Sequence, residues 1–184
     1  GKEEELVDFF DWFANQPAQH KLLVAGNHDR GLQKKIEKYN LQLPNSVTLL
    51  TNSGIEIGGV RFWGTTFVSH TLAFLNQLKG QTEDVENKIY SQIPSGTDVI
   101  ITHNAPKGIL DFASPDGYSV GSVALLNKVV AIKPKLHIFG HVHYQYGVKK
   151  SGNTIFINAS LVNNEEELIN KPIILSDSLN LGYS

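Results

Sequence analysis

Three short apolar runs in this chain are each followed at once by a polar string that contains histidine. The strings are Gly26-Asn27-His28-Asp29, Thr102-His103-Asn104-Ala105-Pro106 and Gly140-His141-Val142-His143, after the runs 22–25, 99–101 and 136–139. Such runs are typical of buried strands, and the ligand-binding groups of an α/β sheet gather beyond the carboxyl ends of its strands. Because neutral imidazole and amide oxygen are ordinary ligands of Zn, Mn or Fe, the sequence predicts part of a metal-centred hydrolytic site.

The composition indicates the class of protein and excludes several kinds of site. With 184 residues, the chain is long enough for one domain with a sizeable core. Its net charge of −2 gives no reason to expect a nucleic-acid partner or an anionic membrane surface. Cysteine is absent, which excludes disulfides, thiolate metal sites and a Cys nucleophile. Since there is no long apolar run and no signal-like segment, we expect a cytoplasmic protein without a membrane partner.

Hydrophobic periodicity predicts strands that alternate with helices, which indicates an α/β architecture. Helices are expected over residues 2–15, 30–39, 82–92 and 120–132, and strands over 21–25, 47–50, 98–102 and 136–139. Two hairpins are expected over 55–62 and 146–157, because glycines in both supply the positive φ of a tight turn. The hairpins add antiparallel pairs, so the sheets should be mixed.

Several apolar side chains are expected to be buried. Val123, Leu126 and Val130 should form the apolar side of the helix over 120–132, and Trp12 and Trp63 should lie in the core.

The last string places two histidines, His141 and His143, two residues apart. In an extended segment such residues project to the same side, so two imidazoles leaving a strand can face two adjacent metal ions. Gly26 and Gly140 are expected to allow a close backbone approach that a side chain would block.

Taken together, the strings resemble the calcineurin-like metallophosphoesterase superfamily. The superfamily pattern is Asp-x-His, Gly-Asp-x-x-Asp, Gly-Asn-His-Asp/Glu, a lone His and Gly-His-x-His, of which the last three are present in order. The resemblance covers roughly residues 20–165. The runs 125–127 and 134–140 look most similar to the small metallophosphoesterase-domain proteins of the brain type.

The resemblance implies a fold for the chain. It is a four-layer αββα sandwich, in which helices flank two mixed β-sheets, here lacking its first strand or strands. Residues 1–170 would form a single metallophosphoesterase domain, and residues 171–184 a terminal strand and tail.

The resemblance also implies two divalent metal ions, drawn from Mn, Fe, Zn or Mg. Carried over by motif, Asn27, His103 and His141 would ligate one ion, and His143 would ligate the other. Two cations neutralise an anionic phosphoester and activate a water for attack.

Three residues of the first string would act on the substrate. Asn27 and His28 would bind it, and His28 would contact the phosphate and protonate the leaving oxygen. Asp29 would hold His28 in position, as a carboxylate commonly does for a catalytic imidazole.

The first two motifs of the superfamily are missing from the sequence, and with them the bridging carboxylate. Asp-x-His and Gly-Asp-x-x-Asp would precede Gly1, and there is no methionine at the start, so we expect a piece of a longer protein or a processed product. Two hard cations need anionic oxygen to hold them together. The hypothesis is therefore that this chain alone binds at most one ion, weakly, and is inactive.

Two functions are compatible with the resemblance. The first is a dinuclear-metal phosphoesterase, active in the intact protein on a small phosphodiester or phosphomonoester, including cyclic nucleotides. The alternative is a non-catalytic protein-binding module on the same fold. The presence of both missing motifs upstream of Gly1 would favour the enzyme.

The remaining histidines have simpler interpretations. His137 lies within an apolar run and is expected to be a core residue with its hydrogen bond satisfied. His20 is expected at the surface, and His70 in a loop.

Three further residues carry open alternatives. Phe112 and Tyr118 could stack on a nucleobase, although packing is the preferred interpretation. Asn158 follows a strand and either supports the metal loops or only ends that strand.

Overall fold

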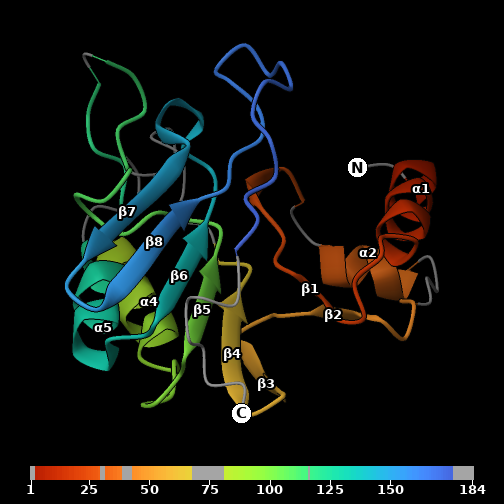
Figure 1. The fold of residues 1–184 in the computed structure, drawn as a ribbon, viewed down its shortest axis with the longest axis horizontal. Helices are drawn as coiled ribbons and strands as arrows, with labels where there is room; N and C mark the ends of the chain where they lie inside the picture. The colour runs from red at the N-terminus through yellow and green to blue at the C-terminus, as the bar shows by residue number, and fades with distance from the viewer. Residues whose placement is uncertain (1–2, 30–31, 39–42, 68–80, 116, 176–184) are drawn as a thin grey trace.

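The computed structural model describes residues 3–29, 32–38, 43–67, 81–115 and 117–175. Its main element is a mixed sheet of six strands (Figure 1). In spatial order the strands are β3 (Ser53–Ile57), β4 (Val60–Thr65), β5 (Val99–Thr102), β6 (Leu136–Phe139), β8 (Thr154–Asn158) and β7 (Gly147–Ser151). The four central strands are parallel, whereas β3 and β7 are antiparallel to their neighbours. Both antiparallel edges come from the hairpins that the sequence predicts.

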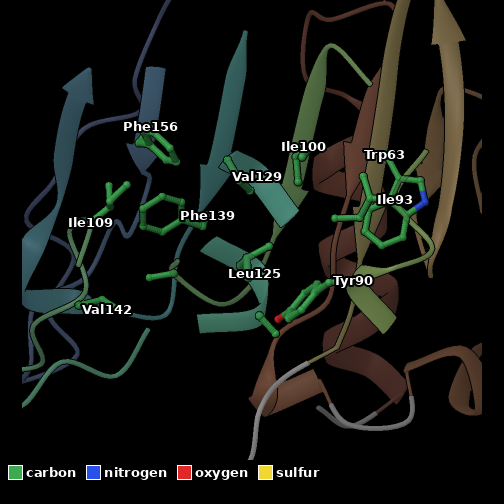
Figure 2. Packing of buried hydrophobic residues seen from close by; sticks show 12 residues of the cluster. Trp63, Tyr90, Ile93, Ile100, Ile109, Leu125, Val129, Phe139, Val142 and Phe156 are labelled. Atoms are coloured by element: carbon green, nitrogen blue, oxygen red, sulfur yellow. The ribbon is translucent and has the colours of Figure 1, made fainter. Parts of the chain in front are cut away.

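Helices α4 (Gln81–Tyr90) and α5 (Val123–Ile132) cover one face of this sheet. The core between these two helices and the sheet contains Trp63, Tyr90, Leu125 and Phe139. Figure 2 shows these side chains packed between helix and strand. Val142, which separates the two histidines of the last string, is buried in the same core. The core therefore anchors that string.

A second, smaller sheet pairs β1 (Lys21–Leu23) with β2 (Val47–Leu49) in parallel. It lies beside helices α1 (Glu3–Ala14) and α2 (Leu32–Lys38), with Phe10 and Leu32 in a shared core. Only the larger sheet is mixed in the described part of the chain. The expectation of two mixed sheets is therefore wrong for β1 and β2.

The expected burial is wrong at two places. Trp63 is buried, but Trp12 is 58% exposed and stacks on Phe13 of its own helix. Helix α5 buries Ala124, Leu125 and Val129, whereas the expected Val123 and Val130 face solvent. This helix is apolar at most positions, so its sequence does not single out one face.

A terminal strand was expected within residues 171–184, only part of which the structure describes. Residues 171–175 have no strand, and 176–184 lie outside the described part. His70 also lies outside it. His20 is exposed, as expected.

Candidate metal centre

The first string forms a tight turn after β1. Asn27–Asp29 is one turn of 3₁₀ helix, η1. Asp29 closes it twice, because its carboxylate accepts the Gly26 N–H at 3.0 Å and its own N–H donates to Gly26 O at 3.1 Å. A Cβ at Gly26 would lie 2.6 Å from Cε1 of His103. The expected close approach is therefore present at Gly26, and glycine is what permits it.

His103 follows β5 and joins two other predicted ligands. Its Nε2 lies 2.8 Å from Oδ1 of Asn27 and 3.0 Å from Nδ1 of His141. The two imidazole rings are 4.7 Å apart between centroids. Nε2 of His103 therefore lies within 3.0 Å of donor atoms from two other, distant segments of the chain.

His141 reaches His103 from a tight turn after β6. Its φ is +69°, and the Val142 N–H donates to Gly140 O at 2.8 Å, so His141 is the central residue of a γ-turn. The Gly140 N–H donates to His103 O at 3.2 Å and ties the second and third strings together. His143 then begins a second turn of 3₁₀ helix, η2 (His143–Gln145). His141 and His143 therefore lie in consecutive turns of a loop and not in an extended segment, and that they face two adjacent ions stays a prediction.

Gly140 does not have the steric role expected of it. A Cβ there would meet only Oγ of Ser160, at 3.7 Å, which is ordinary van der Waals contact. The unusual backbone conformation lies one residue later, at His141.

The electrostatics keep the converging imidazoles neutral. Burial lowers the pKa of His103 to about 4, with smaller lowering effects from His141, His28 and His143 and an opposing effect from Asp29. Burial also lowers the pKa of His141, as do the charges of His143 and His28. A neutral imidazole has the free lone pair that a metal ion requires. Both rings therefore hold the ligand form near neutral pH.

The donor set fits one divalent ion. Neighbouring donors in an octahedral shell with bonds of ~2.1 Å are about 3.0 Å apart, and the observed separations are 2.8 and 3.0 Å. Two imidazole nitrogens and an amide oxygen suit Mn, Fe or Zn. Within the described residues, no group of three or more His, Cys, Asp or Glu is arranged to hold a metal ion. The candidate ligand set therefore has only two histidines, His103 and His141, and takes its third donor from the amide oxygen of Asn27.

Two of the residues predicted to act on substrate, His28 and Asp29, directly follow Asn27 of this cluster. His28 and Asp29 are both exposed, and His28 is close enough for its charge to lower the pKa of His103. The carboxylate of Asp29 accepts the Gly26 N–H. A contact in which Asp29 orients His28 stays a prediction.

Two buried residues form hydrogen bonds close to the candidate ligands. Asn158 is fully buried and binds the loop that carries His141 and His143. His137 is also fully buried, and its Nε2 lies 2.9 Å from Oγ1 of Thr102, which donates to Asn104 O at 2.7 Å. Thr102 Oγ1 therefore accepts from His137, and the pair braces both neighbours of His103. The only sequence signal for Asn158 is its place at the end of an apolar strand.

The preferred packing of Phe112 and Tyr118 is wrong. They are 43% and 57% exposed. The Phe112 N–H donates to Oε1 of Gln145 at 2.8 Å, which fastens this loop to η2.

The sequence model of the family described as calcineurin-like phosphoesterase matches residues 1–145. The chain belongs to this family. The resemblance of the three strings is thereby confirmed, and the family typically has two metal ions.

Several curated relatives match nearly the whole chain. A UPF0046 protein of Caenorhabditis elegans is 35% identical over 190 residues, covering 95% of this chain and 63% of that protein. Metallophosphoesterase domain-containing protein 1 of Homo sapiens is 30% identical over 201 residues, covering 95% of this chain and 60% of that protein. The chain thus spans about three fifths of the length of these two curated relatives.

Solved structures share the fold. The protein TT1561 of Thermus thermophilus has a TM-score of 0.53 at 11% identity, covering 87% of this chain and 71% of that chain. Another crystal structure has a TM-score of 0.61 at 19% identity, covering 85% of this chain and 63% of that chain.

Among the described residues, no helix has both the length and the apolar character needed to cross a bilayer.

Proposed function

We propose that the full-length protein is a metal-dependent hydrolase of small phosphodiesters or phosphomonoesters, including cyclic nucleotides. The observation that carries the proposal is the convergence of Asn27 Oδ1, His103 Nε2 and His141 Nδ1. We propose these three as ligands of one divalent ion and His143 as a ligand of a second. When bound, the ions supply charge neutralisation of the phosphoester and activation of a water.

The chain's own residues then bind and protonate the substrate. Asn27 and His28 contact the phosphate, and His28 donates a proton to the leaving oxygen. The exposure of His28 leaves its imidazole accessible to a ligand arriving from solvent. Asp29 holds the turn that carries both residues, through its two hydrogen bonds with Gly26.

The fold proposal extends to the whole domain. Residues 1–170 belong to one domain of the four-layer αββα type. Because the ligand set of this chain contains no carboxylate for bridging two ions, we propose that the 184-residue chain binds at most one ion, weakly, and is inactive alone.

A substrate panel with the full-length protein tests the proposed activity. The protein is stripped with a chelator, reloaded with Mn, Zn, Mg or Fe, and assayed on bis(p-nitrophenyl) phosphate, p-nitrophenyl phosphate and cyclic nucleotides. We expect metal-dependent turnover. His103→Ala and His141→Ala should lower it by more than the roughly 10–100-fold typical of losing an outer-shell partner of a metal ligand.

His20→Ala is the matched control, because His20 is an exposed histidine that precedes β1 and belongs to none of the three strings. It should keep full activity. Unchanged activity in either ligand variant would refute the assignment. A folded, metal-loaded protein with no turnover on any ester would favour the alternative, a protein-binding module on the same fold.

A further inference from the structure

Asn158 is a fully buried amide at the carboxyl end of β8. In the sheet it lies opposite Phe139, the last residue of β6, and Gly147, the first residue of β7. The loop that carries His141 and His143 runs from the end of β6 to the start of β7. The Asn158 side chain is therefore placed between the two ends of that loop.

The side-chain amide of Asn158 commits both of its N–H donors to the loop. Its Nδ2 donates to Val142 O at 2.7 Å and to Gln145 O at 2.9 Å. Its Oδ1 accepts the Ser160 N–H at 3.1 Å, which fixes the orientation of the amide. The two carbonyls lie on either side of His143 in the sequence, so one side chain clamps the backbone around this histidine.

The clamp begins directly after a strained residue. His141 has a φ of +69° at the centre of a γ-turn, a conformation that is rare and unfavourable for a residue with a Cβ. Such a conformation persists only where the surrounding structure enforces it. Val142 supplies that constraint, because its side chain is buried in the core and its carbonyl is bound by Asn158.

We propose that Asn158 is a positioning residue of the metal centre, whose amide holds the loop so that His141 and His143 face the metal ions. This inference rests on the proposed function, because it assigns these histidines as ligands. Without the amide, the buried carbonyl of Val142 and the partly buried carbonyl of Gln145 lose a donor. The γ-turn then relaxes, and His141 Nδ1 moves away from His103 Nε2.

The test compares Asn158→Ala with Thr154→Val in the full-length protein. Thr154 lies at the other end of β8, is also buried, and donates through Oγ1 to Pro134 O at 2.6 Å. Each substitution removes a buried side-chain donor from the same strand, but only Asn158 contacts the histidine loop. The readouts are the Mn²⁺ affinity by calorimetry, the thermal midpoint, and the NMR signals of the histidine rings.

We expect both variants to lower the thermal midpoint and only Asn158→Ala to weaken Mn²⁺ binding, by roughly 10–100-fold as for other outer-shell partners. Asn158→Ser, which retains one short donor, should lose less affinity, and it replaces Asn158→Ala if that variant does not fold. Equal Mn²⁺ affinity in wild type and a folded Asn158 variant would overturn the proposal. An equal loss of affinity in Thr154→Val would also overturn it, because general destabilisation would then be sufficient.

The NMR readout separates this inference from the proposed function. If the wild type binds no Mn²⁺, the proposed metal centre fails, and the ring signals of the metal-free protein decide the role of Asn158. Shifted or broadened signals of His141 and His143, with those of His20 unchanged, would support the clamp. Unchanged signals of all three would overturn it.

Discussion

Nε2 of His103 lies 3.0 Å from Nδ1 of His141, although the two residues are 38 positions apart in the chain. Two imidazole nitrogens at this distance cannot both carry a proton, so at least one of them presents a lone pair. Oδ1 of Asn27 adds a further acceptor, 2.8 Å from the same Nε2. A proton on Nε2 can be shared with both neighbours as a hydrogen bond, and once that proton is removed the three atoms can serve as ligands of one cation.

Gly26→Ala should damage the metal centre, whereas Gly140→Ala should not. The new Cβ at position 26 would lie 2.6 Å from the His103 ring, but at position 140 its nearest neighbour is 3.7 Å away. We expect Gly26→Ala to cost roughly 1–3 kcal/mol of stability, as overpacking does, and to weaken Mn²⁺ binding. Urea unfolding and calorimetry on both variants measure the difference. Equal behaviour of the two would contradict the packing of Gly26 against His103.

Metal binding should persist below the pH at which ordinary histidine ligands are lost. Burial lowers the pKa of His103 to about 4 and also lowers that of His141. Since protons compete with the metal ion for imidazole, depressed pKa values move the loss of affinity to lower pH. We expect Mn²⁺ affinity to change little between about pH 7 and about pH 6. A steep fall centred on the ordinary histidine pKa of roughly 6.5 would show that these ligands are solvated.

His137 should make the protein sensitive to acid. Burial lowers its pKa from 6.5 to about 3, so the unfolded chain takes up a proton more readily than the folded one. Neutral His137 therefore makes its full contribution to the free energy of unfolding above about pH 6.5. That contribution falls as the pH drops toward about 3, and about 2 kcal/mol of it is lost by about pH 5. His137→Gln has a donor for Thr102 Oγ1 but does not titrate. Urea unfolding at neutral pH and at about pH 5 should show a smaller loss for this variant, and an identical loss would contradict the assignment.

Ser122→Ala should destabilise the fold away from the metal site. Its hydroxyl caps α5 by accepting the Leu125 N–H at 3.1 Å and donates to the buried carboxylate of Glu86 at 2.5 Å. Loss of the cap costs about 1 kcal/mol, and a buried carboxylate deprived of a donor costs about 1–3 kcal/mol more. Ser91→Ala removes an exposed hydroxyl bonded to Lys88 O and should cost less than about 0.5 kcal/mol. Thermal and urea unfolding compare the two, and equal losses would contradict the role of Ser122.

The sequence predicted the placement of the three strings because strand ends are visible as apolar runs that stop at polar residues. The helices and both hairpins follow from the same periodicity, within a few residues at their ends. Helix α5 was oriented wrongly because most of its residues are apolar, so Val123 and Leu125 are equivalent in the pattern.

Two features of the site have little or no sequence signal. The positive φ of His141 occurs at a non-glycine residue, where the residue type does not predict it. The role of Asn158 depends on backbone carbonyls 13 and 16 positions away, and any residue type can supply a carbonyl. The sequence left the role of Asn158 open between supporting the metal loops and ending a strand, and its contacts are visible only in the packed structure.

A Mn²⁺ titration of the 184-residue chain tests the central claim most directly, with His103→Ala and His141→Ala as ligand variants and His20→Ala as the control. We predict one weak site in the wild type and in His20→Ala, and none in the two ligand variants. Binding that survives both ligand substitutions, or two tightly bound ions per chain, would contradict the proposed centre of Asn27, His103 and His141.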